Sequence, residues 1–199
     1  MRLHASELAC IRGGRQVFAA LDFSLAAGES LVVTGRNGAG KSSLLRMLAG
    51  LVRIAGGRLE LQGGDPELSV PEQSHYLGHQ DALKPSLSVE ENLNFWARYL
   101  GAEPAEDVLA QVGLESLAQL PAGYLSAGQR RRLSLARLLA VKRPIWLLDE
   151  PTSALDAASQ TRLTDVMRRH LAGGGLIVAA THGPLGLESA RELRLGDAA

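Results

Sequence analysis

The sequence contains few cysteines and few aromatic residues. Among its 199 residues there is one cysteine, Cys10, and aromatic residues account for 4% of the chain. A single thiol excludes an internal disulfide framework and a four-cysteine zinc site, and there is no C-x-x-C-H motif for covalent attachment of haem. We therefore expect Cys10 to be a small residue of the core. The length suits one domain, or one domain with a small insertion.

The sequence also lacks net charge and long apolar runs. Lysine plus arginine and aspartate plus glutamate both number 21, so no net field draws the chain toward nucleic acid or an anionic membrane. We expect specific surfaces to recognise its partners, and no nucleic acid among them. The N-terminus lacks the layout of a signal peptide, and no apolar run approaches the length of a membrane span. These absences predict a cytoplasmic protein, unless a partner holds it at a membrane.

The strongest motif fits the phosphate-binding pattern G-x-x-x-x-G-K-[ST]. A short apolar run at residues 31–33 precedes it, as a buried parallel strand would, and apolar residues at helical spacing follow it through residue 49. The pattern requires a strand before the glycine loop and a helix after it, and the sequence predicts both. The motif comprises Gly35, Arg36, Asn37, Gly38, Ala39, Gly40, Lys41 and Ser42.

Glycines allow the backbone of such a loop to bend around an anion, so that its N–H groups and the helix N-terminus point at a β-phosphate. Lys41 would bridge the β- and γ-phosphates, and Ser42 would hold Mg²⁺. The alternative is an ordinary glycine turn with an exposed lysine, but only three of the 21 basic residues are lysines. We therefore favour a nucleotide-binding loop.

Two adjacent carboxylates, Asp149 and Glu150, follow a fully apolar run at residues 145–148. Open α/β sheets place ligand-binding groups at the carboxyl ends of their strands. There, Asp149 would orient Mg²⁺ and its water shell, while Glu150 would polarise the attacking water as a general base. A solvated surface pair is the alternative, but the apolar strand favours a pair aimed at the ligand edge.

Two further polar residues follow predicted strands. Gln80 ends the run that begins at residue 74 and could reach Mg²⁺ or the attacking water, and His182 follows the apolar strand 176–180 and could donate to the γ-phosphate. His75 and His79 share one strand face, which raises the question of a haem or metal site. Two histidines without further ligands are more often core or surface residues.

The segment 81–125 is helical in composition. A capping box at Ser88 opens a helix that runs to Leu100, and Pro104 suits the first turn of a second helix through Val112. These features predict a small helical insertion between strands of the core.

A second capping box, at Ser126 and Gln129, opens a helix through residue 140 and offers free N–H donors at an exposed Ser-Ala-Gly. The arginines at 130–132 lie in its first turn, where the helix dipole disfavours cations. Their side chains contact either nearby carboxylates or phosphates, or only solvent, and the sequence does not decide between these alternatives. Asp156 would cap a further helix from residue 157.

Residues 3–11 and 16–25 predict antiparallel strands that precede the glycine loop. Arg12 or Phe18 could stack on an adenine base, through a guanidinium plane or a ring face. A solvated arginine and a core phenylalanine are the alternative reading.

In order and spacing, these motifs resemble the ATP-binding cassette of ABC transporters over nearly the whole chain. In that family they are the Walker A loop, Q-loop, signature, Walker B with catalytic glutamate, D-loop and switch histidine. The corresponding residues here are, in the same order, 35–42, Gln80, 125–129, Asp149 with Glu150, 153–156 and His182. The resemblance implies an α/β P-loop NTPase fold with a mostly parallel core sheet, N-terminal antiparallel strands and a small helical insertion. It implies one ATP-binding domain over 1–199, with a helical subdomain at about 81–140.

The resemblance also implies ATP hydrolysis with Mg²⁺ by a head-to-tail homodimer. The implied catalytic residues are Glu150, His182, Lys41 and Gln80, and the implied Mg²⁺ residues are Ser42, Gln80 and Asp149. Beyond residues 35–42, the implied ATP contacts are Ser43, Arg12, Ser126, Gly128, Gln129 and Asp156. The chain departs from the family pattern in two places, because Ala127 replaces the usual signature glycine and Arg12 replaces the usual adenine-stacking aromatic residue.

A narrower resemblance is to the haem-exporter ATPase subunit of bacterial cytochrome c maturation. It depends on the short chain, the signature followed by three arginines, and residues 77–80 and 181–185. It implies a peripheral subunit on the cytoplasmic face of the inner membrane, bound to membrane-spanning subunits and haem-handling proteins. The residues leave open whether haem is moved or a haem chaperone is released. They also leave open the ATPase of another small transporter and, in a different class, an ATP-gated clamp on DNA or ribosomes.

Overall fold

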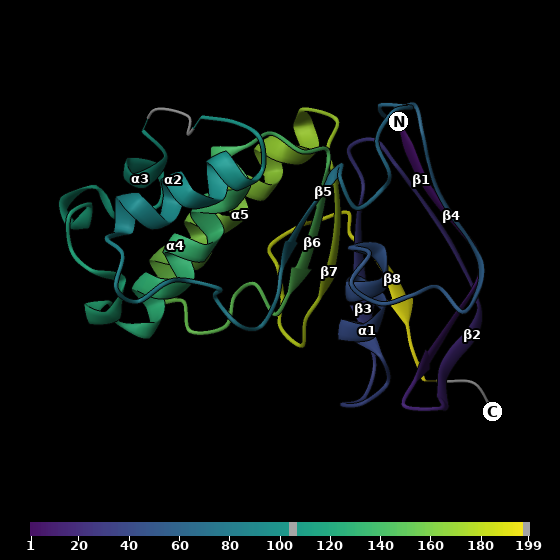
Figure 1. Cartoon of the computed structure of the whole chain (residues 1–199). Coiled ribbons are helices and arrows are strands. Elements are labelled where there is room, and N and C mark those ends of the chain that lie inside the picture. Colours follow the sequence, from purple (N-terminus) through teal and green to yellow (C-terminus); the bar gives the residue numbers. More distant parts are fainter. Residues whose placement is uncertain (104–106, 197–199) are drawn as a thin grey trace. The chain divides into compact units, whose positions relative to one another are not determined.

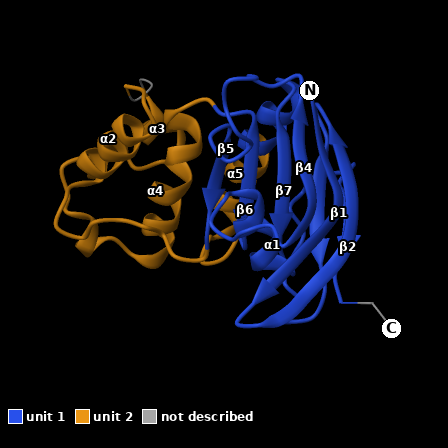
Figure 2. Cartoon of the chain, turned by 45° about the vertical axis from the view of Figure 1, so that its right-hand side comes forward, with its two compact units in different colours: residues 1–78, 143–151, 166–199 blue, residues 79–142, 152–165 orange. Residues whose placement is uncertain are grey.

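This computed structural model describes residues 1–103 and 107–196. The chain divides into two compact units (Figure 2). Unit 1 comprises Met1–Gly78, Arg143–Pro151 and Val166–Ala199, and unit 2 comprises His79–Lys142 and Thr152–Asp165. The assignment of both units to one ATP-binding domain, with a helical subdomain at about 81–140, stays a prediction.

Unit 1 contains a five-stranded sheet in which every pair of neighbours is parallel. The two central strands are buried along their whole length, as the apolar runs predict for strands covered on both faces. Helix α1 (Lys41–Leu48) contacts both of them. In sheet order, the strands are β5 (Ser74–Leu77), β6 (Ile145–Asp149), β7 (Leu176–Ala180), β3 (Ser30–Thr34) and β8 (Arg191–Arg194).

A second, antiparallel sheet completes unit 1 (Figure 1). Its order is β2 (Arg15–Ala26), β1 (Arg2–Arg12), β4 (Gly56–Gln62). One apolar core joins both sheets to α1, and it includes Leu3, Leu25, Leu44 and Val33. Cys10 is fully buried in this core, and burial raises the pKa of its thiol.

Unit 2 is helical. Its helices are α2 (Val89–Tyr99), α3 (Val108–Gln111) and α4 (Ala127–Ala140), with 3₁₀ turns at Glu115–Leu117 and Ala122–Tyr124. Helix α5 (Ala157–Ala172) begins in this unit and ends in unit 1. Both predicted capping boxes are present, at Ser88 and at Ser126.

One predicted helix has different bounds, and one strand was not predicted. The helix expected to run through Val112 ends at Gln111 and begins at Val108, because Asp107 before it has a left-handed backbone with φ 61°. The proposed start at Pro104 lies outside the described residues. Strand β8 was not predicted, because its residues are largely exposed and show no apolar alternation. Among the described residues, no helix is both long and apolar enough to cross a membrane.

Candidate nucleotide site

The loop between β3 and α1 requires glycine at two positions. Gly35 has φ 137°, and a Cβ there would overlap the carbonyl oxygen of Leu195. Gly40 has φ 103°, and a Cβ there would lie 2.5 Å from a methyl carbon of Val17. Both residues adopt backbone conformations that side chains disfavour, and both are closely approached. The sequence pattern therefore matches a sterically defined turn.

Lys41 is the first residue of α1 and is 8% exposed. Its Nζ donates to the carbonyl oxygen of Gly35 at 2.7 Å and to that of Arg36 at 3.3 Å. The loop thus wraps around its own ammonium group at the positive end of a helix. This arrangement concentrates donors where an anionic phosphate would bind.

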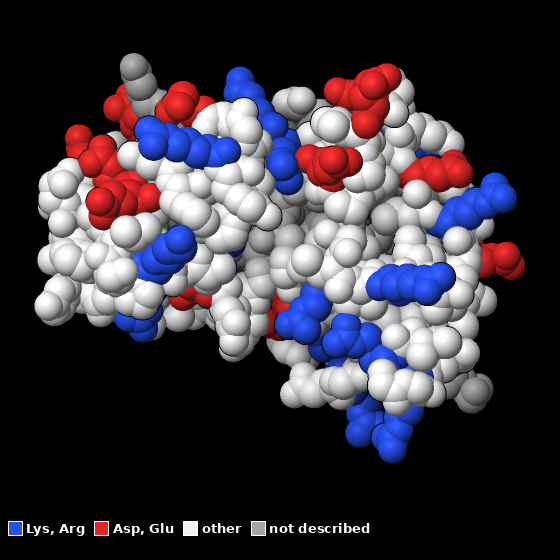
Figure 3. Space-filling view, in the orientation of Figure 1, with Lys and Arg blue, Asp and Glu red and all other residues white. Residues whose placement is uncertain are grey.

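Basic side chains also gather around this part of unit 1. On the face drawn in Figure 3, they cluster over the region in which Figure 1 places α1 and the tip of the β1–β2 hairpin. Such a cluster attracts a polyanionic ligand although the chain as a whole has no net charge.

Ser42 and Asp149 meet beside the loop. Ser42 Oγ donates to Asp149 Oδ1 at 3.1 Å, and Asp149, the last residue of β6, is 4% exposed. A hydroxyl and a carboxylate are hard oxygen ligands that suit Mg²⁺. Across residues 1–103 and 107–196, no three His, Cys, Asp or Glu side chains form a metal-binding cluster. A cation here would need further oxygen ligands, such as those that phosphate and water supply to Mg²⁺ in nucleotide sites.

Glu150, His182 and Asn37 also converge in unit 1. His182 Nε2 lies 3.0 Å from Asn37 Oδ1 and 4.0 Å from Glu150 Oε1. If Nε2 carries the imidazole proton, the Asn37 amide oxygen accepts a hydrogen bond from it, since an amide oxygen only accepts hydrogen bonds. The backbone N–H of Glu150 donates to Ala180 of β7 at 2.8 Å. The ends of two buried strands and the glycine loop thus bring an acid, an imidazole and an amide together.

The N-terminal hairpin contacts the loop through β2. Atoms of Val17 and Phe18 lie within 3.2 Å of the place where a Cβ on Gly40 would be. Val17 was missed in the sequence, because no local pattern distinguishes it from any other strand valine. Arg12 is the exposed last residue of β1 and is paired with Arg15 in the hairpin. Its stacking on adenine stays a prediction.

Unit 2 holds the predicted signature residues at the start of α4. Ser126 Oγ accepts from the backbone N–H of Gln129 at 3.2 Å, and Gln129 Oε1 accepts from that of Ser126 at 2.8 Å. Ser126 and Ala127 are exposed, while a Cβ on Gly128 would lie 3.0 Å from the carbonyl oxygen of Ala154. The helix start is therefore rigidly capped and open to a ligand.

The other predicted residues of unit 2 are Asp156 and Gln80. Asp156 Oδ1 accepts from the N–H of Ser159 at 2.8 Å and caps α5 as predicted, and hydrogen bonds from Ser159 lower the pKa of the carboxyl group. Gln80 is exposed and lies in a bend, because β5 ends at Leu77. The expectation that Gln80 ends the strand itself was wrong by three residues.

His75 and His79 differ in their exposure to solvent. His75 is 5% exposed within β5, whereas His79 is exposed beyond the end of that strand. Neither belongs to a group of metal-ligating side chains in the described parts of the chain. The alternative reading, as core and surface residues, is therefore the better description.

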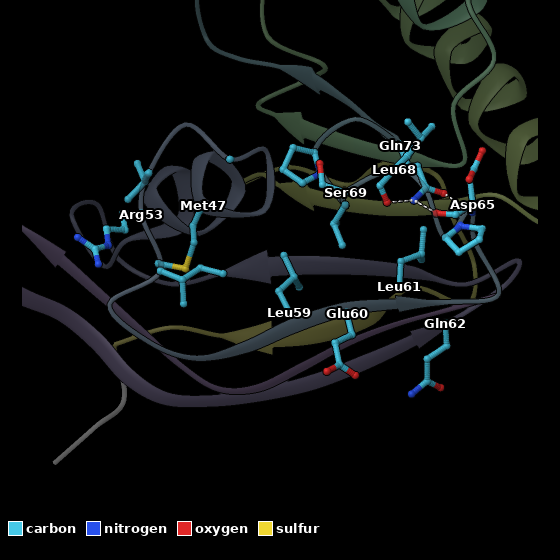
Figure 4. A pocket seen from close by; sticks show the side chains of 16 residues that line it. Met47, Arg53, Leu59, Glu60, Leu61, Gln62, Asp65, Leu68, Ser69 and Gln73 are labelled. Atoms are coloured by element: carbon cyan, nitrogen blue, oxygen red, sulfur yellow. Dashed lines mark hydrogen bonds between the residues drawn. The ribbon is translucent and has the colours of Figure 1, made fainter.

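A pocket of about 760 Å³ lies elsewhere in unit 1, between α1, β4 and the loop that follows β4. In Figure 4, Leu59 and Leu61 point into it, while Glu60 and Gln62 point away. Gln73 closes the loop through hydrogen bonds from Nε2 to the carbonyl oxygens of Asp65 and Leu68, at 3.0 and 2.8 Å. None of the predicted nucleotide-binding residues lines this pocket.

Comparisons with known proteins identify the family. A family model described as ABC transporter matches residues 18–153. Proteins named "Cytochrome c biogenesis ATP-binding export protein CcmA" from Nitrobacter winogradskyi, Bradyrhizobium diazoefficiens and Rhodopseudomonas palustris are 63%, 62% and 65% identical, each over 100% of both chains.

Two solved structures show the same fold. A putative ABC transporter ATP-binding protein from Pyrococcus furiosus has a TM-score of 0.84 at 22% identity, over 98% of both chains. An ATP binding subunit of an ABC transporter has a TM-score of 0.86 at 21% identity, over 98% of this chain and 86% of its own. The phosphate loop and the carboxylates at the strand end agree with the full-length relatives. This chain is an ATP-hydrolysing member of the ABC transporter family and belongs to its cytochrome c biogenesis ATP-binding export proteins.

Proposed function

We propose that this chain powers haem export, or the release of a haem-loaded chaperone, in cytochrome c maturation. The observation that carries this proposal is identity above 60% over the full length of relatives named for cytochrome c biogenesis and export. The proposed partners are a second copy of the chain, membrane-spanning subunits and haem-handling proteins. The proposed location is the cytoplasmic face of the bacterial inner membrane, where the chain would be a peripheral subunit.

In this proposal, the glycine loop binds the phosphates of ATP. Backbone N–H groups of residues 35–42 and the N-terminus of α1 contact the β-phosphate, and Lys41 neutralises charge between the β- and γ-phosphates. Ser42 and Asp149, whose Oγ and Oδ1 atoms lie 3.1 Å apart, would hold Mg²⁺, and Gln80 would be a further ligand of the same cation. The cation would supply charge neutralisation and orient the phosphate oxygens.

Glu150 accepts the proton of the attacking water, and His182 donates from Nε2 to the γ-phosphate. The contact of 3.0 Å with Asn37 supports the second role, because it places Nε2 next to the glycine loop. Hydrolysis removes the γ-phosphate and so removes the acceptor that His182 contacts. The histidine therefore reports whether ATP or ADP occupies the site.

The exposed start of α4 binds the γ-phosphate of ATP held by the partner chain. Its N–H groups and the Ser126 hydroxyl form a second anion-binding end within one chain, and the capping box keeps it preformed. Two chains facing head to tail would enclose two ATP molecules. ATP would then close the dimer, and hydrolysis would open it.

The deciding experiment is affinity purification of the tagged chain from its native membranes, followed by identification of the proteins that co-purify. We expect small membrane subunits together with haem-handling proteins. A different set of membrane subunits would leave the ATPase chemistry intact and overturn the haem assignment. Recovery of ribosomes or DNA without membrane subunits would overturn the transporter role.

A further inference from the structure

Arg131 and Arg132, at the start of α4, have different partners, which answers part of a question that the sequence left open. Arg132 Nη1 donates to the carbonyl oxygens of Val112 and Gly113 at 2.9 and 2.8 Å, so it holds the end of α3. Arg131 points elsewhere. It is 2% exposed, and its Nη1 lies 3.4 Å from Asp81 Oδ1. One guanidinium group is thus buried against one carboxylate within unit 2.

Asp81 receives a second bond from the same helix. Its carbonyl oxygen accepts from Ser134 Oγ at 2.8 Å, and Ser134 is fully buried. Arg131 and Ser134 are three residues apart and therefore share one face of α4. This face of α4 therefore contacts both the side chain and the backbone of Asp81. Asp81 directly follows Gln80 in the sequence.

The residues that follow Asp81 are fixed by α2. Trp96 Nε1 donates to the carbonyl oxygen of Ala82 at 3.1 Å. Asn92, which is 1% exposed, accepts from the N–H of Lys84 at 2.8 Å and donates to its carbonyl oxygen at 3.0 Å. The bend after Gln80 is therefore attached to the helices on both sides, and it has little freedom to move independently of them.

The negative charge of Asp81 compensates the positive charges of two buried arginines, Arg131 and Arg137. Arg137 is 7% exposed, and its guanidinium lies 4.4 Å from the ring centre of Trp96. Burial, together with the positive charge of Arg131, lowers the pKa of Arg137 to about 10, while Asp81 acts in the opposite direction. Removing the carboxylate would leave two buried cations facing each other, which is strongly unfavourable.

We propose that Asp81, Arg131 and Ser134 form a latch through which the signature helix positions Gln80 for ATP hydrolysis. This proposal rests on the proposed catalytic role of Gln80. Helix α4 carries the anion-binding end at Ser126 and, just over one turn later, the arginine that holds Asp81. A displacement of α4 when a phosphate binds at Ser126 is thereby passed to the residue next to Gln80. Arg131 would act as a positioning residue, through its contact with Asp81.

A double-mutant cycle tests the latch. ATP hydrolysis is measured for the full-length chain, assembled with the membrane subunits that co-purify with it, as the wild type, Gln80→Ala, Arg131→Met and the double variant. We expect Arg131→Met to lower kcat about five- to tenfold with KM for ATP nearly unchanged. In the Gln80→Ala background the same substitution should have no further effect. Two independent, multiplying losses would overturn the latch.

The same cycle separates this proposal from the one on which it rests. Unchanged kcat in Gln80→Ala would remove Gln80 from the mechanism, whereas a loss in Gln80→Ala with unchanged kcat in Arg131→Met would refute the latch alone. Arg131→Lys keeps the charge and should restore at least half of the lost kcat. A Lys variant as slow as the Met variant would contradict the charge contact.

A stability control uses the same turn of α4. Leu133 is 1% exposed in the core of unit 2, and Leu133→Ala should destabilise the fold while leaving kcat within about twofold at a permissive temperature. If Arg131→Met does not fold, Ser134→Ala removes only the hydroxyl bond to Asp81. It should lower kcat about threefold, and this loss should also disappear with Gln80→Ala. A Ser134→Ala enzyme with full kcat would count against the latch.

Discussion

At the scale of single residues, Glu150 has an unfavourable backbone conformation. Its φ of 47° is in the left-handed region, which costs a residue with a Cβ about 1–2 kcal/mol. The bond from its N–H to Ala180 keeps it there. Directly after the buried Asp149, the carboxylate of Glu150 lies 4.0 Å from His182 Nε2, so adjacent carboxylates at one strand end have different surroundings.

Glu150→Gln preserves the shape of the side chain but removes its capacity to accept a proton. We expect kcat for ATP hydrolysis to fall about 10²- to 10⁴-fold with nucleotide affinity retained, because binding depends on the loop and Lys41. Steady-state hydrolysis and equilibrium binding of ATP measure both effects. Glu188→Gln, at an exposed glutamate outside the site, is the control. Full turnover by Glu150→Gln would exclude Glu150 as the base.

His170 gives the fold a specific dependence on pH. Its ring stacks on Trp146 at 3.9 Å, and burial lowers its pKa below the ordinary value of 6.5. As the pH falls below about 6.5, the unfolded chain takes up this proton before the folded chain does, so the free energy of unfolding decreases.

His170→Gln should remove this part of the pH dependence. Urea unfolding at pH 7.5 and pH 5.5 measures it, and the exposed His4→Gln is the matched control that should keep the wild-type difference. An unchanged difference in His170→Gln would show that other groups cause the acid sensitivity.

At the scale of elements, local interactions were predictable and distant ones were not. The capping boxes at Ser88 and Ser126 join groups three residues apart, and the glycine loop carries its own backbone requirement, so both were visible in the sequence. Strand β8 exists because it pairs with β3, with Leu31 opposite Arg191, and its own residues contain no such signal. The contact between Asp81 and Arg131 spans 50 positions and was equally invisible.

The two capping boxes allow a matched test of the signature helix. Ser126→Ala and Ser88→Ala each remove a side-chain acceptor at a helix start, and each should lower the free energy of unfolding by about 1 kcal/mol. Only Ser126→Ala should also reduce ATP hydrolysis, because Ser126 is the proposed contact with the partner's γ-phosphate. Urea unfolding and hydrolysis rates measure the two effects. Equal rates for both variants would place the signature contact elsewhere.

At the scale of the whole molecule, the proposed function divides each ATP site between two chains. The loop with Lys41 belongs to unit 1 and the helix start with Ser126 to unit 2. In a head-to-tail dimer, each ATP would contact Lys41 of one chain and Ser126 of the other. Loss of either residue should therefore damage both sites of a homodimer, while a mixed dimer keeps one intact site.

Mixing Lys41→Ala chains with Ser126→Ala chains should raise hydrolysis above the rate of either variant alone. Random association makes half of the dimers mixed, and each has one of two sites intact, so up to about a quarter of the wild-type rate should return. Hydrolysis is measured before and after mixing at the same total concentration. A mixture no faster than its components would mean that both residues act on the same ATP within one chain.

The two tryptophans of the chain lie in different units. Trp146 belongs to unit 1, where it is buried against His170, and Trp96 belongs to unit 2, beside Arg137. Each unit thus contains its own intrinsic fluorophore in a distinct environment. Substituting either one with phenylalanine leaves tryptophan emission from the other unit alone, so this emission can follow the melting of each unit separately in the unlabelled protein.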